Sequence, residues 1–297
     1  MLNRRGCQMT RNPRRSLHGI QVKTPEQVVA MRRAGLVVEA GLAAMGAAAR
    51  PGVTTGQLDT IGREVLDAHG ATSSFLHYGA GFGLPPYPGV VCLSVNDEVV
   101  HGIPGKRVLR DGDILSIDFG AIVDGWHGDA ARTVCVGEVS DDARDLIEAT
   151  RQAMWAGVAA MWRGGSSGVR VGDVSAAIEA SARSQPRRYG IVREYTGHGI
   201  GTAMHQPPDV PNWGRPHRGA RVERGVVLAI EPMLTLGGDR VVEGSDEWTV
   251  STADHSLAAH WEDTVAVMAD GLWVLTEPDG GRAELEARGV PCAGDAG

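Results

Sequence analysis

An internal repeat is the feature of this sequence that most constrains its fold. The heptapeptide at 112–118, GDILSID, recurs as GVVLAIE at 225–231, an offset of 113 residues (225 − 112). Each copy is an apolar run after a glycine, which predicts a buried strand, and each ends in a carboxylate, Asp118 or Glu231. A buried carboxylate is costly unless it is paired or binds a metal. The two matching carboxylates therefore predict a site on a pseudo-twofold axis.

A second pair of matching segments extends the repeat. GVTTGQL at 52–58 resembles GVRVGDV at 168–174, and each follows a long helical pattern and begins a shorter one. An acidic strand then follows each heptapeptide, with Asp129 in the first half and Glu262 in the second. Chance similarity is the alternative, but two blocks that recur in the same order favour duplication within one domain. We expect helix, helix, strand, strand and two carboxylates in each half.

The chain is predicted to form one domain between two tails. Its 297 residues suffice for one large domain or two small ones, and the repeat favours one. The expected parts are a basic N-terminal extension, 1–23, a single domain, 24–276, with half-repeats at about 24–139 and 140–276, and a frayed C-terminal tail, 277–297. Helices are expected at 24–49, 56–69, from 140 to before 164, and at 174–184, and strands outside the repeat at 74–78 and 90–95.

Composition excludes several classes of protein. The net charge of −7 argues against a general nucleic-acid binder, although residues 1–23 hold six basic residues and no acidic one. That segment is expected to be solvated, with a transient ribosome contact as the alternative. The four cysteines form no CxxC pair, which indicates reduced thiols rather than a disulfide framework. No stretch has the length and apolar character of a membrane span, and we expect a cytoplasmic protein.

The origin and the start of the chain leave weaker signals. Arginine is strongly preferred over lysine, which occurs only at Lys23 and Lys106, and this bias suggests a GC-rich bacterial genome. The first 22 residues lack the apolar segment of a secretory signal but have the arginine-rich, acid-free character of a transit peptide. Met9 is an alternative start.

A tight turn brings two aspartates together. Asp124-Gly125 is a strong signal for a two-residue type I′ hairpin, in which paired residue numbers sum to 249. Asp118 then pairs with Ala131, and Asp118 and Asp129 lie on one face as diagonal neighbours, roughly 7–8 Å apart. Carboxylates that close repel unless a proton or cation lies between them. A pair of surface aspartates near a turn is the plainer alternative, and the buried strand argues against it.

Three histidines are candidates for the same site. His198 lies between glycines in GHGIG, His205 follows seven residues later, and His101 occurs where a strand ends in HGIP. Carboxylates with an imidazole suit hard or borderline divalent metals. A nucleotide loop at 79–83 is excluded, because the prolines at 85–88 prevent the helix that must follow. The other histidines are interpreted as surface or strand residues: His18, His69, His77, His127, His217, His255 and His260.

These motifs resemble those of the type I methionine aminopeptidases, whose pita-bread fold is shared with prolidase and creatinase. The matching motifs are HGIP at 101–104, IDFG at 117–120, HGDAA at 127–131, GHGIG at 197–201, EPM at 231–233 and WED at 261–263. The resemblance covers about residues 24–276. It implies an α+β fold of two pseudo-symmetric halves with antiparallel sheet and metal ions between them.

The resemblance also implies roles for individual residues. Asp118 and Asp129 would bind a first divalent ion, His198 and Glu231 a second, and Asp129 and Glu262 would bridge the two; Co, Mn, Fe(II), Zn and Ni are all compatible. Glu231 would transfer a proton from the attacking water, His205 would donate toward the carbonyl oxygen, and His101 would bond the scissile amide nitrogen. The matching positions of the methionine pocket are Tyr87, Cys92, Met204 and Trp248.

The implied reaction is removal of the N-terminal methionine from nascent polypeptides whose second residue is small. A monomer without membrane or nucleic-acid partners is expected. Ala130, Met204 and Asp263 depart from the family pattern, while all the expected ligands are present. Two alternatives are an Xaa-Pro aminopeptidase or prolidase-type enzyme and a non-catalytic pita-bread binding protein.

Overall fold

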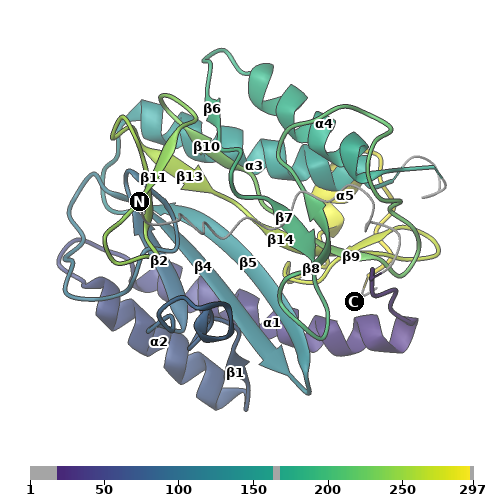
Figure 1. Cartoon of the computed structure of the whole chain (residues 1–297), viewed down its shortest axis with the longest axis horizontal. Helices are drawn as coiled ribbons and strands as arrows, with labels where there is room; N and C mark the ends of the chain where they lie inside the picture. Colours follow the sequence, from purple (N-terminus) through teal and green to yellow (C-terminus); the bar gives the residue numbers. More distant parts are fainter. Residues whose placement is uncertain (1–18, 163–167, 295–297) are drawn as a thin grey trace.

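Two similar halves, each a helical pair on a sheet, make up the protein (Figure 1). The structure is a computed structural model, and it describes residues 19–162 and 168–294. In the first half, α1 (Pro25–Ala48) and α2 (Thr55–Ala68) cover a four-stranded antiparallel sheet. Its strands are β1 (Thr72–Ser73), β2 (Val91–Val95), β4 (Ile114–Val123) and β5 (Trp126–Cys135).

The second half repeats this arrangement. Helices α3 (Asp141–Ala160) and α4 (Val171–Arg183) cover a five-stranded antiparallel sheet in the order β15-β14-β9-β7-β8. Its strands are β7 (Gly197–Gly199), β8 (Gln206–Val210), β9 (Val227–Ile230), β14 (Asp263–Val267) and β15 (Leu272–Val274). The two heptapeptides form β4 and β9 with their flanking residues, so the predicted pair of half-copies is confirmed at the level of fold.

Two small three-stranded sheets complete the chain. One joins β13 (Ala258–His260), β10 (Met233–Thr235) and β6 (Gly190–Ile191), and the other joins β11 (Val241–Glu243), β12 (Val250–Thr252) and β3 (Glu98–Val100). Because β3 belongs to the first half and β12 to the second, the latter sheet links the halves through Val100 and Val250.

Local signals explain where the first helices begin. Thr24 accepts a hydrogen bond from the amide of Gln27, whose side chain accepts one from the amide of Thr24, and Thr54 and Gln57 repeat this capping box before α2. The expected helices at 24–49 and 56–69 agree with these bounds to within a residue. Helix α4 begins at Val171, three residues earlier than predicted, and the predicted end of α3, just before 164, lies outside the described ranges.

The predicted β4–β5 hairpin is confirmed in turn and register. Asp124 and Gly125 have φ of 50° and 79°, the left-handed conformation that a type I′ turn needs at both positions. Asp118 pairs with Ala131 and Gly120 pairs with Asp129, as the sum of 249 requires. Both aspartates therefore project from the same face of the hairpin.

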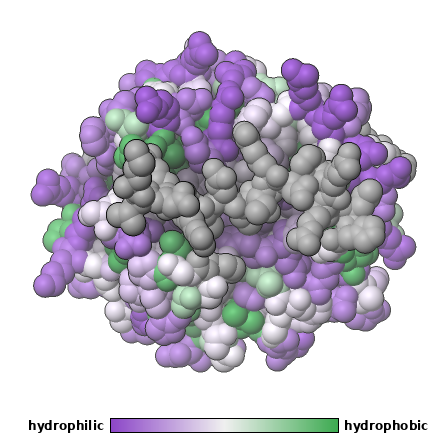
Figure 2. All heavy atoms as spheres, viewed as in Figure 1, coloured by the Kyte–Doolittle hydropathy of each residue, from purple (hydrophilic) through white to green (hydrophobic). Residues whose placement is uncertain are grey.

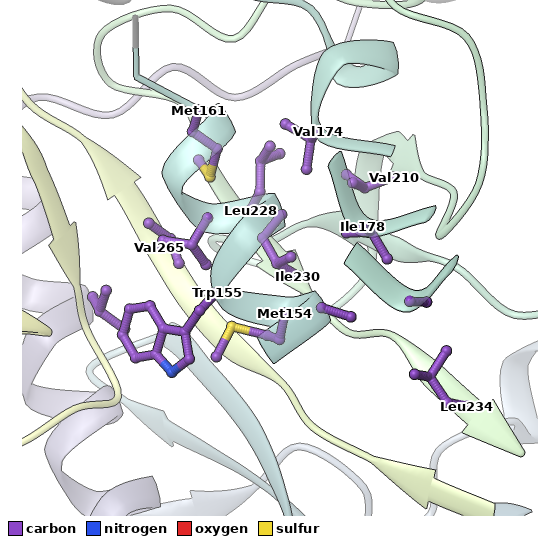
Figure 3. Close-up of a cluster of buried hydrophobic side chains, with 14 of the residues drawn as sticks. Met154, Trp155, Met161, Val174, Ile178, Val210, Leu228, Ile230, Leu234 and Val265 are labelled. Carbon is purple, nitrogen blue, oxygen red and sulfur yellow. The ribbon is translucent and has the colours of Figure 1, made fainter. Parts of the chain in front are cut away.

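Separate apolar cores stabilise the two halves. Phe119, Leu58 and Met45 belong to the core of the first half, and Trp155, Met154 and Ile230 belong to that of the second, where side chains of α3, α4 and the sheet interdigitate (Figure 3). The face drawn in Figure 2 is dominated by hydrophilic side chains with scattered hydrophobic ones. Among the described residues, no helix is both long and apolar enough to span a membrane.

The structure corrects two expectations. No strand forms at 74–78, where one was predicted: β1 ends at Ser73, whose Oγ accepts hydrogen bonds from the amides of Phe75 and Leu76, and the chain turns there. The segment after 276, expected to fray, contains α5 (Arg282–Ala287) as far as it is described. Asp279 accepts hydrogen bonds from the amides of Gly281 and Ala283 at the start of this helix, and Leu285 is fully buried in the second core. Val290, also in this segment, is buried in the same core, so apolar contacts that the polar composition did not indicate hold the segment to the domain.

Candidate metal centre

Four carboxylates converge where the two halves meet. Asp118 lies on β4 and Asp129 on β5, while Glu231 directly follows β9 and Glu262 directly precedes β14. The β9–β14 pairing ends at Ile230 and Asp263, so both glutamates stand at the same end of that pair. An antiparallel bridge between Ala131 and Glu262, with amide-to-carbonyl distances of 2.9 and 3.3 Å, joins the two pairs. The carboxylates of the two repeated segments therefore lie together in one site.

Two groups of potential ligand atoms share one glutamate. Atoms of Asp129, His198 and Glu262 lie within 4.8 Å of one another, and atoms of Asp118, His260 and Glu262 form a second group within the same limit. Asp129 and Glu262 are only 3% and 2% exposed, and Asp118 is half-buried. The arrangement therefore offers two adjacent sets of possible metal ligands that have Glu262 in common.

The oxygens of these groups fit a metal. Among the described residues, Oδ1 of Asp118, Oδ1 of Asp129 and Oε1 of Glu262 are buried and have no hydrogen-bond partner. Buried polar atoms in proteins are otherwise almost always hydrogen-bonded. Carboxylate oxygens beside imidazole nitrogens form a donor set suited to borderline divalent ions such as Mn, Fe, Co, Ni and Zn. The residues present therefore fit divalent cations.

Electrostatic repulsion within the group also points to a cation. Burial raises the pKa of Asp118 to about 7. Burial and then the charge of Asp118 raise the pKa of Asp129 well above its usual value, and the pKa of Glu231 and of Glu262 is raised by burial and by neighbouring carboxylates. A positive ion between these oxygens would oppose those shifts, because it favours the ionised carboxylates.

His198 is held in the state that binds metals. It is 2% exposed, and its Nδ1–H donates to the carbonyl of Gly199 at 3.0 Å, which leaves Nε2 free of a proton. That Nε2 lies 3.4 Å from Oε1 of Glu231. Burial lowers the pKa of His198 to about 4, so the imidazole is neutral at physiological pH.

His205 and His101 border the carboxylates from two other loops. The ring of His205 lies 4.3 Å from that of His198, centroid to centroid, and its Nδ1 is hydrogen-bonded to the hydroxyl of Tyr78 at 2.6 Å. His101 is held edge-on to Tyr195 and Trp248, with centroid distances of 5.4 and 6.1 Å. Burial lowers the pKa of His101 to about 4 and that of His205 well below its usual value. Both can donate or accept a proton as neutral imidazoles.

A cluster of apolar side chains adjoins the carboxylates. Tyr87, Cys92 and Met204 belong to one buried cluster against which Trp248 packs, so the structure brings together the four residues expected to line a methionine pocket. Cys92 pairs directly with Asp118 across β2 and β4, which puts both side chains on the same face. Trp248 donates from Nε1 to the carbonyl of Pro85 at 2.9 Å and thereby holds the 79–88 loop to this cluster.

Two residues of this site escape the sequence analysis. Tyr78, predicted as part of a strand, contacts His205 from a turn, and nothing in its local sequence indicates that partner. His260, interpreted as a surface or strand histidine, does lie on β13, but it is 2% exposed and faces Glu231 and Glu262. A signal for His260 did exist, since residues two apart on an extended chain share a face and His260 precedes Glu262 by two.

Comparisons with known proteins agree with this geometry. The model of metallopeptidase family M24 matches residues 29–269. Methionine aminopeptidase 1 of Mycobacterium tuberculosis (strain CDC 1551 / Oshkosh) is 52% identical over 252 residues, covering 83% of this chain and 91% of that protein. Methionine aminopeptidase 1 of Bacillus subtilis (strain 168) is 40% identical over 254 residues, covering 86% of this chain and 98% of that protein.

Solved structures show the same similarity. Methionine aminopeptidase of Thermotoga maritima superposes with a TM-score of 0.81 at 37% identity, covering 87% of this chain and 99% of that one. Prolidase of Pyrococcus furiosus superposes with a TM-score of 0.66 at 18% identity, covering 86% of this chain and 65% of that one. The second likeness concerns the fold alone.

Proposed function

We infer the function of this chain from its family: it belongs to metallopeptidase family M24 and, within that family, to the methionine aminopeptidases. The fold is the pita-bread fold, α+β with antiparallel sheets in two similar halves. The chain is a metal-dependent aminopeptidase that releases N-terminal methionine. The observation that carries this conclusion is the set of four carboxylates and His198 between the halves, beside a cluster of apolar side chains.

We propose that two divalent ions are bound per chain. One would be held by Asp129, His198 and Glu262 with Glu231 beside them, and the other by Asp118 and Glu262, with Asp129 shared as the resemblance implies. The unpartnered oxygens of Asp118, Asp129 and Glu262 support this assignment. When bound, such ions supply Lewis-acid chemistry, since they make a water more acidic and polarise the scissile carbonyl.

The residues around the ions would orient the substrate and move its protons. Glu231, whose pKa is raised by burial, would accept the proton of the attacking water. His205, positioned by Tyr78, would donate toward the carbonyl oxygen, and His101 would bond the amide nitrogen of the scissile bond. The free α-amine would bind beside the carboxylates, which restricts cleavage to the first residue.

Substrate choice would come from the cluster of Tyr87, Cys92, Met204 and Trp248. Its thiol, thioether and aromatic surfaces suit the flexible, polarisable side chain of methionine. We propose nascent polypeptides with a small second residue as substrates, which sets the reaction in the cytosol. A monomeric state and a transient ribosome contact through residues 1–23 complete the proposal; residues 1–18 of that segment lie outside the described ranges.

Release of free methionine from Met-Ala-Ser tests the proposal. Chelator-stripped protein is assayed with and without Mn²⁺ or Co²⁺, beside Met-Leu-Ser and an Ala-Pro peptide. We expect metal-dependent release from Met-Ala-Ser, slower release from Met-Leu-Ser and no cleavage of Ala-Pro. Cleavage of Ala-Pro would favour a prolidase-type enzyme, and inactivity on every peptide with every metal would favour a binding protein.

A further inference from the structure

His260 has a buried imidazole ring beside two glutamates, and no hydrogen bond of the ring to the described part of the chain compensates its burial. Its Nε2 lies 3.7 Å from Oε2 of Glu262 and 3.9 Å from Oε2 of Glu231. The side chain is 2% exposed, and neither ring nitrogen has a hydrogen-bond partner among the described residues. A buried imidazole without partners is unfavourable, because its lost hydrogen bonds to water are not replaced. Something other than these protein atoms should therefore compensate it.

The distances around Nε2 suit a shared cation better than hydrogen bonds. At 3.7 and 3.9 Å, the nitrogen is too far from either carboxylate oxygen for a hydrogen bond. Two ligands of one ion, each about 2.0–2.2 Å from it, lie roughly 3–4 Å apart. The separations around His260 match that spacing, as does the 3.4 Å between Nε2 of His198 and Glu231 in the other group.

The fold fixes His260 in this position from both sides. Strand β13 pairs with β10, so that His260 lies opposite Met233 in the second half. From the first half, Thr133 Oγ1 donates to the carbonyl of His260 at 2.8 Å and accepts from its amide at 2.9 Å. Because strands of both halves hold the backbone of His260, its ring faces the carboxylates in a fixed direction.

We propose that His260 is a nitrogen ligand of the ion held by Asp118 and Glu262. Each of the two ions would then have one imidazole, His198 on one and His260 on the other, with Glu262 between them. This inference rests on the proposed metal-dependent function and adds a ligand to it. An imidazole at this position raises the preference for Co²⁺, Ni²⁺ or Zn²⁺ over Mn²⁺, since nitrogen ligands suit the former ions better than an all-oxygen set does.

Binding of Co²⁺ to a His260→Gln variant tests this assignment. Metal-free wild type, His260→Gln and the control His255→Gln are titrated with Co²⁺ against a competing chelator, and the visible absorption of bound Co²⁺ is recorded. His255 is an exposed histidine whose Nδ1 is hydrogen-bonded to Asp97 on the surface. Its replacement should therefore change neither the affinity for Co²⁺ nor the absorption spectrum of bound Co²⁺. We expect His260→Gln to lose about 10–100-fold in affinity for one of two ions and to change the spectrum of that ion.

Equal affinities and spectra in all three proteins would overturn the assignment of His260 while leaving the proposed function intact. Failure of wild-type protein to bind Co²⁺ would instead overturn the proposed function. The melting temperatures of the metal-free proteins, compared beforehand, show whether the substitution disturbs folding.

A measurement on wild-type protein makes the test independent of any variant. In the Co²⁺-loaded chain, ring N–H protons of coordinated histidines give exchangeable, strongly shifted NMR resonances. We expect signals from two imidazoles, His198 and His260. Signals from only one imidazole at full Co²⁺ occupancy would contradict the proposal.

Discussion

The two buried imidazoles of the centre are neutral, which is the ionisation state that a metal ion requires of a histidine ligand. Burial lowers the pKa of His198 to about 4 and that of His260 to about 3, so both imidazoles are neutral and can offer a lone pair. The neighbouring carboxylates Asp129 and Glu262 have raised pKa values, because burial disfavours their charged forms and the nearby carboxylate charges repel them. A cation between them would bind the lone pairs of the imidazoles and offset the negative charges of the carboxylates.

Tyr78 should matter for catalysis through His205. Tyr78→Phe removes the hydroxyl bonded to Nδ1 of His205 at 2.6 Å, which frees the imidazole to rotate and changes its tautomer balance. We expect kcat to fall roughly 5–10-fold, the equivalent of about 1 kcal/mol, with a shifted pH profile and unchanged Co²⁺ affinity. Tyr189→Phe, in the second core, is the control. An unchanged kcat and pH profile would exclude this positioning role.

Lys23 should make stability depend on pH in the alkaline range. Burial lowers its pKa from 10.5 to about 8, so the charged form is disfavoured in the folded chain. The penalty is full below pH 8, fades as pH rises from 8 to 10.5, and is absent above that range. We expect Lys23→Met to stabilise the protein at pH 7 by about 2–3 kcal/mol, with the gain fading across that interval.

Urea unfolding at several pH values measures this effect. Lys106→Met is the matched control, because Lys106 is exposed and is the chain's other lysine. A gain from Lys23→Met that persists unchanged at pH 10.5 would show that packing, rather than ionisation, is responsible.

At the scale of helices and strands, the sequence predicted those features of the fold that depend on contacts between residues close together in the chain. The caps at Thr24 and Thr54 and the Asp124-Gly125 turn involve residues within a few positions, and the predicted starts of α1 and α2 and the predicted β4–β5 register agree with the structure. Strand β4 was predictable because a buried strand has a continuous apolar run. The family resemblance added the expected ligands and pocket residues.

Contacts between distant elements could not be predicted in the same way. Tyr78 and His205 are 127 residues apart, and the bonds between Thr133 and His260 span the same separation. Residues 282–287 form a helix because Leu285 packs in a core built mostly from α3, α4 and their sheet. Such partners depend on how the halves dock, which no short window of sequence records.

Helix α1 should tolerate a side chain at one glycine but not at another. A Cβ at Gly41 would lie 2.6 Å from Cδ1 of the buried ring of Phe119, next to Asp118, whereas at Gly46 the nearest atom is Val134 Cγ1 at 3.8 Å. We expect Gly41→Ala to destabilise the protein by about 1–3 kcal/mol through overpacking. Gly46→Ala should stabilise it by up to about 1 kcal/mol, as alanine favours the helix. Thermal unfolding measures both, and equal effects would contradict this packing.

At the scale of the whole molecule, Arg132 links the first half to the second next to the candidate metal centre. From β5 it donates to the carbonyl of Glu262, and it lies 2.7 Å from carboxylate oxygens of both Asp263 and Glu277. Asp263, one of the departures from the family pattern, is fully buried and also accepts from Thr276 at 2.6 Å. The unusual aspartate therefore takes part in a network that joins the halves.

Removing the guanidinium should weaken the whole fold. We expect Arg132→Met to destabilise the protein by roughly 3–5 kcal/mol, because the charge of Asp263 loses its buried partner. Adding Asp263→Asn should restore part of the loss. Arg144→Met, which breaks an exposed pair with Glu138 at 3.6 Å, should change stability by less than about 0.5 kcal/mol. If the surface variant and Arg132→Met are equally stable, the network does not hold the halves together.

The central claim is that carboxylates from both halves hold two divalent ions that are required for methionine release. Stepwise addition of Co²⁺ to metal-free protein, with free methionine from Met-Ala-Ser recorded at each step, tests it most directly. We expect no release without metal, activity that saturates by two ions per chain, and weak binding with no turnover in Asp129→Asn, which loses a charge shared by the ions. Full activity in the metal-free chain, or wild-type activity of Asp129→Asn at limiting metal, would contradict the claim.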